Sequence, residues 1–274
     1  NYIKQLNNKK IIYFHDVGYP GMITKKYLSK VNTDYVAQLG DDDYLIPDGL
    51  KKCIKFLDKN PNFSAAHGEG IIVTSSENPN KINHIDLYAQ TVRLENSAKE
   101  RVFKHLSDNT QPNFSVFRKK VFEKILSPIP NFEDSALCPN RGISDYLIQT
   151  TMSVVCTKIK EISSLYLVRQ ITSVEFEYPH TRKGKDFDKS IEYFIEKISE
   201  AICDNESLDY NYVKAYVKKG LDNYLNPKAK KILKSNTNLS NLHKNPKHRF
   251  FNPFLIVYNS IIGGIKLKTR VADY

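Results

Sequence analysis

The sequence predicts an α/β fold, with a mostly parallel sheet flanked by helices and a helical C-terminal region. Up to about residue 175, short apolar runs such as Tyr35–Leu39 alternate with amphipathic segments such as Gly49–Leu57. This alternation is typical of parallel sheets whose strands are joined by helices. From about residue 186 the strand patterns disappear while helical patterns continue. We therefore expect two regions, residues 1–185 and residues 186–274.

The individual elements follow from apolar spacing and turn residues. The helix Gly49–Leu57 has Leu50, Ile54 and Leu57 on one face, and Asn60-Pro61-Asn62 ends it. The other expected strands are Ile11–Phe14, Phe63–His67 with Gly70–Thr74 (one strand broken at Gly68-Glu69-Gly70), Asn113–Arg118 and Ser164–Val168. The other expected helices are Ile23–Lys30, part of Asp86–Asn109, Lys119–Leu126, Ser144–Val155 with Ser144 as its cap, Asp188–Cys203, Tyr210–Tyr224 and Pro227–Leu233.

Composition and charge limit the kinds of protein and partner that fit this sequence. The 274 residues are 41% hydrophobic, enough for a sizeable core. The net charge of +11 favours anionic partners, and the excess is concentrated in Lys228–Lys234 and Lys244–Arg249. The four cysteines lack the spacing of a zinc or redox motif, which favours a reducing compartment. No apolar run is long enough to span a membrane, although Leu255–Ile265 is either a membrane-surface element or a packed helix.

The acidic triplet Asp41-Asp42-Asp43 directly follows the predicted strand Tyr35–Leu39. Open α/β sheets bind ligands at this end of their strands. Three adjacent carboxylates repel one another, and a divalent metal that also binds phosphate oxygens would relieve the repulsion. The alternative is a solvated acidic turn that caps the next helix. Pro47 and Asp48 already serve that role, so the triplet favours a metal site.

Residues 32–50 (NTDYVAQLGDDDYLIPDGL) resemble the family 2 glycosyltransferases, which have the GT-A fold. Their pattern runs from "D-Y-V" through a strand and an acidic D-x-D to "L-x-P-x-G-L" at the start of a helix. Weaker similarity in Asn113–Phe122, Ile143–Leu147 and Tyr166–Gln170 extends the resemblance over roughly residues 8–175. Nothing before Ile11 resembles the family's first nucleotide-binding strand, so we expect an N-terminally incomplete domain.

The resemblance implies transfer of a sugar from a nucleotide sugar, most simply of the UDP type, to an acceptor hydroxyl. It implies that Asp43 binds Mn²⁺ or Mg²⁺ and that Asp41 faces the ribose or the same metal. Asp42 would either assist them or simply cap the turn. It places the general base of an inverting reaction at Asp145, with Glu133 and Asp134 as a fallback pair. Helix-terminal charge compensation is the alternative role of Asp145.

Three further residues are candidates for the same site. Arg169 would contact the diphosphate or pair with a carboxylate. His180 would be an additional metal ligand. Asp16, which follows the strand Ile11–Phe14, would lie near the nucleotide base.

The expected acceptor is a surface glycan or a lipid-linked glycan. We expect a cytoplasmic protein with peripheral contact to the inner membrane face through the basic C-terminal region. The first competing hypothesis is another metal-dependent nucleotide-processing enzyme, but the phosphate-binding G-x-x-x-x-G-K-S/T motif is absent from the sequence. The second is a basic protein that binds nucleic acid or other anions without catalysis, for which the sequence contains no recognised motif.

Overall fold

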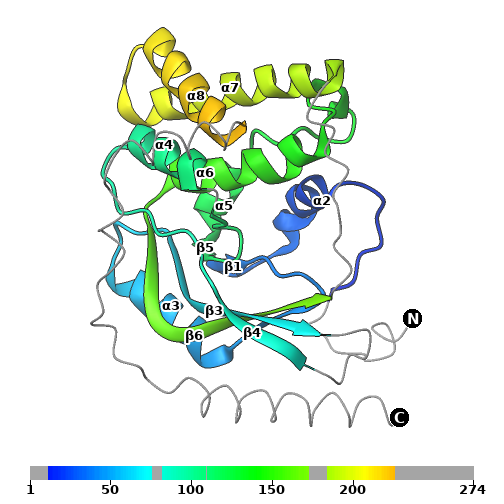
Figure 1. Cartoon of the computed structure of the whole chain (residues 1–274), viewed down its shortest axis with the longest axis vertical. Coiled ribbons are helices and arrows are strands. Elements are labelled where there is room, and N and C mark those ends of the chain that lie inside the picture. The colour runs from blue at the N-terminus through cyan, green and yellow to red at the C-terminus, as the bar shows by residue number, and fades with distance from the viewer. Residues whose placement is uncertain (1–11, 76–81, 109, 173–183, 226–274) are drawn as a thin grey trace. The chain divides into compact units, whose positions relative to one another are not determined.

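The computed structural model describes residues 12–75, 82–108, 110–172 and 184–225 (Figure 1). This part of the chain has an α/β fold, as predicted. Its helices are α2 (Pro20–Tyr27), α3 (Pro47–Lys59), α4 (Ala98–Asp108), α5 (Lys119–Leu126), α6 (Ile148–Cys156), α7 (Lys185–Glu206) and α8 (Tyr210–Leu225). Its strands are β1 (Tyr35–Ala37), β2 (Asp43–Leu45), β3 (Ala65–Ser75), β4 (Ile82–Tyr88), β5 (Val116–Arg118) and β6 (Ile159–Thr172). Short 3₁₀ turns cover Leu28–Lys30 and Ser135–Leu137, and a π-helical turn, Gly142–Leu147, precedes α6.

The sheet is mixed, which corrects the prediction of a mostly parallel sheet. Its order is β1-β5-β3-β6-β2, with β4 also paired to β3. In the described residues, β3 and β6 are parallel, whereas the other four pairs are antiparallel. The link from β3 to β4 is too short for the crossover that a parallel pair requires. The directions of the other pairs depend on contacts between residues far apart in sequence, which apolar patterns do not reveal.

Most predicted helices are confirmed, but the first predicted strand, Ile11–Phe14, is wrong. Residues 12–17 form no strand; Ile12 and Phe14 are exposed, and the Phe14 ring stacks on Tyr27 with 4.0 Å between centroids. The segment Asp86–Asn109 is helical in part, as predicted, because α4 lies within it, but the unpredicted strand β4 includes Asp86. Ile82, Ile85 and Leu87 of β4 are all exposed, so burial imposes no regular apolar pattern on this strand. The helix predicted at Pro227–Leu233 and the segment Leu255–Ile265 lie outside the described residues.

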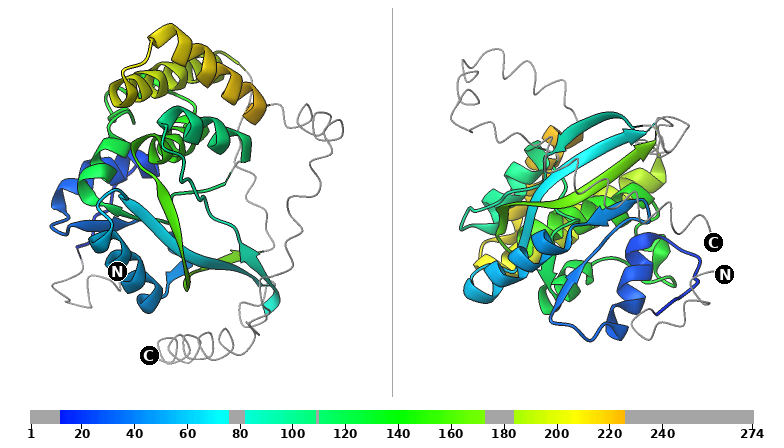
Figure 2. Two further views of the ribbon diagram at one scale, coloured as in Figure 1. Left: turned by 90° about the vertical axis from the view of Figure 1, so that its left-hand side faces the viewer. Right: turned by 90° about the horizontal axis from the view of Figure 1, so that it is seen from below.

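The sheet separates two hydrophobic clusters. Adjacent strand residues point to opposite faces, so Phe117 packs with α4–α8 while Val116 packs with α3. Buried residues of α7 and α8, such as Phe194 and Val217, belong to the same cluster as those of α4 and α6. Figure 2 shows α7 and α8, in yellow, stacked on the green helices. The described part of the predicted C-terminal region is thus helical. The domain boundary at residue 185 stays a prediction.

None of the helices within the described ranges is long and apolar enough to cross a lipid bilayer.

Glycine allows α3 to approach β6 closely. A Cβ atom at Gly49 would overlap the carbonyl oxygen of Leu165 and would lie 2.8 Å from the Cα atom of Tyr166. Both obstacles are backbone atoms of β6, so a larger residue cannot be accommodated by a change of rotamer. This contact positions the helix that directly follows the acidic turn and β2.

We expect Gly49→Ala to lower the free energy of unfolding by about 2 kcal/mol or more, because overpacking against backbone outweighs the helix-propensity gain. Urea unfolding monitored by circular dichroism measures this change. Lys55→Ala, at an exposed position of the same helix, is the control and should change stability by less than about 0.5 kcal/mol. Equal stability of the two variants would contradict the close approach.

Candidate functional site

Asp43 is the buried member of the acidic triplet. Strand β2 begins at this residue and places it opposite Arg169 on β6, where the Nε atom of Arg169 lies 3.3 Å from each carboxylate oxygen. Only 5% of Asp43 is exposed. Burial raises the pKa of Asp43, the Arg169 guanidinium opposes that rise, and the neighbouring Asp42 adds to it. We predicted that Arg169 would either contact the diphosphate or pair with a carboxylate. The structure shows it paired with the carboxylate of Asp43.

Aromatic rings hold the Arg169 guanidinium in place. Its central carbon lies 4.7 Å from the ring centroid of Phe114 and 5.0 Å from that of Tyr88. The Tyr88 hydroxyl donates in turn to Gln111 at 3.0 Å. Cation–π contacts at these distances favour a fixed, charged guanidinium. Strand β4, which carries Tyr88, was not predicted, so sequence reasoning missed this support.

The triplet turn gathers carboxylate oxygens beside Gly40. A Cβ atom at Gly40 would lie 2.8 Å from Oδ1 of Asp42 and 3.1 Å from Oδ2 of Asp43. Asp41 and Asp42 are exposed. Two carboxylates at one turn fit a hard cation that completes its oxygen shell with ligand phosphates. The structure therefore associates Asp42 with Asp43, and the predicted partnership of Asp41 with Asp43 stays a prediction.

The described residues contain no group of three or more His, Cys, Asp or Glu side chains able to hold a metal ion. A cation at the triplet turn would therefore take only part of its ligands from the described residues. The predicted ligand His180 lies outside the described residues, so its role stays a prediction.

Asp145 lies in the π-helical turn rather than in a regular helix, and Ser144 is buried in that turn instead of capping α6. The Asp145 side chain is 11% exposed. Its Oδ1 accepts a hydrogen bond of 3.2 Å from the Gly21 amide at the start of α2. A Cβ atom at Gly21 would lie 2.9 Å from that oxygen, so glycine permits the approach. π-helical turns of this kind occur frequently at functional sites.

The electrostatics of Asp145 suit proton transfer near neutral pH. Burial raises its pKa to about 6, while the Gly21 amide and Arg141 oppose the rise. The Arg141 Nε atom is 3.6 Å from Oδ2, which is too long for a hydrogen bond. Oδ2 is buried and receives no hydrogen bond within the described part of the chain. Asp145 is therefore a buried carboxyl group with one oxygen that lacks a hydrogen-bond donor.

One cavity of about 440 Å³ brings Asp145 and Arg169 together. Gln38, from the segment between β1 and the triplet, and Gln149, from α6, also line it, and the Gln149 amide donates to the Gln38 side chain at 2.6 Å. Sequence reasoning missed both glutamines. Gln149 lies in a helix whose residues are almost all buried, and a polar residue in such a helix was the available signal.

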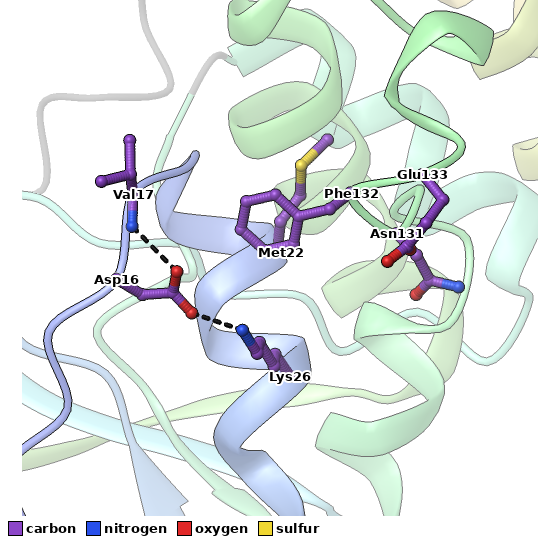
Figure 3. Close-up of a pocket in the computed structure, with 7 residues that line it drawn as sticks. All are labelled: Asp16, Val17, Met22, Lys26, Asn131, Phe132 and Glu133. Atoms are coloured by element: carbon purple, nitrogen blue, oxygen red, sulfur yellow. Dashed lines mark hydrogen bonds and ion pairs between the residues drawn. The ribbon is translucent and has the colours of Figure 1, made fainter.

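Asp16 lines a different cavity, of about 330 Å³ (Figure 3). Its Oδ2 accepts hydrogen bonds from Lys26 at 2.6 Å and from the Tyr27 hydroxyl at 2.9 Å, and these contacts lower its pKa. The fallback base Glu133 lines this cavity too, whereas Asp145 does not. The structure therefore does not bring Asp16 together with Arg169, and a role of Asp16 at the nucleotide base stays a prediction.

Comparison with known proteins agrees with the resemblance seen in the sequence. Residues 2–126 match the model of the family described as glycosyl transferase family 2. The match covers 125 of the 274 residues, a little under half of the chain. The acidic triplet falls inside the matched segment, whereas Asp145 and Arg169 lie beyond residue 126. No curated protein matches the chain.

Two solved structures from S. aureus are similar to the chain. TarS 1-349 has a TM-score of 0.39 and 17% identity, over 76% of this chain and 51% of that one. A structure of TarS has a TM-score of 0.40 and 16% identity, over 76% of this chain and 31% of that one. The chain thus spans about half of the first protein and about a third of the second.

The raised pKa of Asp145 predicts a pH-dependent effect on stability. The folded protein holds this proton more tightly than the unfolded chain, so the stabilisation by protonation is complete below about pH 4 and lost as pH rises through about 6. Asp145→Asn removes the ionisation. We therefore expect the variant to be more stable than the wild type at pH 8, by about 1–3 kcal/mol, with no gain at pH 4.

Urea unfolding at pH 4 and pH 8 measures this difference. Glu192→Gln, which neutralises an exposed carboxylate on α7, is the control and should behave like the wild type at both pH values. A stability gain for Asp145→Asn that is the same at both pH values would show that the carboxyl group does not titrate as described.

Proposed function

We propose that the chain transfers a sugar from a nucleotide-sugar donor, of the UDP type, to a hydroxyl group of a glycan or lipid-linked acceptor, with inversion and with the help of Mn²⁺ or Mg²⁺. The observation that carries this proposal is the shared cavity. It joins Asp145, a buried carboxyl group with a pKa of about 6, to Arg169, which pairs with Asp43 of the acidic triplet. The match of residues 2–126 to the model of glycosyl transferase family 2 supports it.

The donor end of the site would lie at the acidic turn. Asp43 and Asp42 would hold the cation, with Asp41 toward the ribose, and a bound cation would neutralise charge on the diphosphate. Arg169 is a fixed positive charge beside the same turn and would stabilise the developing negative charge of the leaving group. Because its guanidinium is held by aromatic rings, little reorganisation would accompany the reaction.

The acceptor end would lie at Asp145. Its ionised carboxylate would take the proton of the acceptor hydroxyl at Oδ2 while the hydroxyl oxygen attacks the anomeric carbon. The bond between that carbon and the phosphate oxygen would break, and its electron pair would leave with the diphosphate. The Gly21 amide donates to Oδ1, and this hydrogen bond would orient the carboxylate so that Oδ2 faces the acceptor.

We extend the proposal to the cellular role. The glycan would belong to a bacterial surface polysaccharide or its lipid-linked precursor, and residues 186–274 would contact the inner face of the membrane. The high positive charge of the chain supports attraction to anionic headgroups.

Donor binding is tested by thermal unfolding with UDP and Mn²⁺. A ligand at about 100 times its Kd should raise the melting temperature by roughly 5–10 °C, and the rise should require the metal. In Asp43→Asn we expect the metal-dependent rise, measured from that variant's own baseline, to disappear. Asp48→Asn, whose carboxylate is exposed on α3, is the control and should retain it. An Asp43→Asn protein with the full rise would contradict the assigned metal ligand.

The base is tested by the pH dependence of UDP release from UDP-sugars in the presence of a glycan mixture. Because the active form of Asp145 is ionised, kcat/KM should fall about tenfold per pH unit below about 6. Asp145→Asn should lose at least about a hundredfold in rate while retaining the UDP–Mn²⁺ thermal shift. Wild-type rates in Asp145→Asn would remove Asp145 as the base.

A further inference from the structure

The candidate site combines groups from two distant parts of the chain. Arg169 lies on β6 and pairs with Asp43, whereas Asp145 lies in the π-helical turn before α6 and is held by the Gly21 amide. The direct partners of the two groups therefore differ. A reaction that uses both groups requires a fixed separation between them, since a misplacement of about 1 Å can slow a reaction about a hundredfold. Side chains that bridge the two parts are therefore candidates for a role in the reaction.

The Gln111 side chain bridges the two parts of the cavity. It lies in the segment between α4 and β5, is half-buried and lines the cavity together with Asp145 and Arg169. Its Oε1 atom accepts a hydrogen bond of 3.0 Å from the Tyr88 hydroxyl. Burial raises the pKa of Tyr146, and a hydrogen bond with the Gln111 side chain opposes that rise. A hydrogen bond that lowers the pKa of a phenol comes from a donor, so the amide nitrogen donates to Tyr146.

These contacts form a chain of hydrogen bonds that all run in one direction. The Arg169 guanidinium hydrogen-bonds to Tyr88, and since a guanidinium can only donate, the Tyr88 hydroxyl oxygen accepts from it. Tyr88 then donates to Gln111, which donates to Tyr146. Hydrogen bonds aligned in this way polarise and strengthen one another, and the first donor is charged. Tyr146 directly follows Asp145, so the chain connects the arginine at the acidic turn with the turn that carries Asp145.

The backbone of Gln111 is itself anchored. Residue 111 forms an isolated bridge with Gln90, and its carbonyl oxygen accepts a hydrogen bond of 3.4 Å from the Thr91 amide. Gln90 and Thr91 are buried, and they follow closely after β4, the strand that carries Tyr88. Gln111 and Tyr88 therefore belong to one backbone unit. The hydrogen bond to Tyr146 joins this unit to the π-helical turn.

We propose that Gln111 is a positioning residue, whose amide holds Tyr88 and Tyr146 together and thereby fixes the turn that carries Asp145 relative to Arg169. The inference rests on the proposed function, since it concerns the geometry of that reaction. Gln111 acts through other side chains and is not itself a catalytic residue. Supporting hydrogen bonds of this kind hold reacting groups within about 0.5 Å of the productive geometry. Loss of the amide should therefore slow the chemical step and leave donor binding unchanged.

The experiment uses the full chain with Gln111→Met, which keeps the length of the side chain but removes both hydrogen-bonding groups. In the assay of UDP release with a glycan mixture, we expect kcat to fall about tenfold or more. The KM for the UDP-sugar should stay within about twofold of the wild-type value, and the UDP–Mn²⁺ thermal shift should be retained. Tyr146→Phe should also lower kcat. The double variant should be no slower than Gln111→Met alone, because the same link is already broken.

Tyr193→Phe is the matched control. The Tyr193 hydroxyl donates to the Pro128 carbonyl oxygen at 2.8 Å, and Tyr193 does not line this cavity. This variant loses one tyrosine hydrogen bond, as Tyr146→Phe does, and should retain the wild-type kcat. The inference is overturned if Gln111→Met keeps the wild-type kcat, or if Tyr193→Phe is equally slow. It is also overturned if the losses in kcat of Gln111→Met and Tyr146→Phe multiply in the double variant, since the two residues would then act independently.

Urea unfolding separates this inference from the proposed function, because it requires no substrate. Tyr88→Phe and Tyr146→Phe each remove a hydroxyl group that bonds to Gln111. Their effects on the free energy of unfolding should be non-additive, by the equivalent of about threefold in the equilibrium constant, and should become additive in the Gln111→Met background. Additive effects in both backgrounds would overturn the inference even if sugar transfer is observed. Non-additive effects in a chain without transfer and without a UDP–Mn²⁺ shift would contradict the sugar-transfer proposal and leave the link through Gln111 standing.

Discussion

Strand β6 pairs with β3 along most of its length and with β2 near its C-terminal end, and the acidic end of the candidate site depends on these pairings. The β2 pairing places Asp43 opposite Arg169, and the close contact at Gly49 fixes the helix that follows. A slip of one residue would turn Arg169 to the other face of the sheet and leave Asp43 buried without its counter-charge. The position of the acidic turn is therefore a property of the register of β6, not of the turn itself.

The site contains two buried carboxyl groups in different environments. Asp43 faces a guanidinium that favours its charged form, whereas Asp145 has only a backbone amide and a more distant arginine to offset burial. Such differences allow one carboxylate to remain a charged ligand while another exchanges protons near neutral pH. Both groups depend on glycines that let oxygen atoms approach closely, at Gly40 and at Gly21.

Local patterns predicted the parts of the fold that local interactions determine. The helices α3 and α5 and strand β1 followed from apolar spacing and turn residues, and Asp145 was expected near the start of a helix. Patterns could not give the antiparallel direction of β2 or the existence of β4, because an exposed strand such as β4 lacks a buried face. The cavity was also beyond prediction, since Gln38, Asn113 and Tyr224 meet there only through tertiary packing.

The π-helical turn at Gly142–Leu147 has a consequence for how this protein could change over evolution. A π-helical turn contains one residue more than the α-helical turn that it replaces. Deleting one residue there would restore a regular helix and rotate Asp145 relative to α6, while the buried residues of α6 would keep their places. The orientation of the carboxylate is nevertheless coupled to the hydrophobic core, because Ile143 and Leu147 of the same turn are buried in the main cluster. A single-codon deletion that re-aimed this group would therefore also require repacking around Ile143 and Leu147.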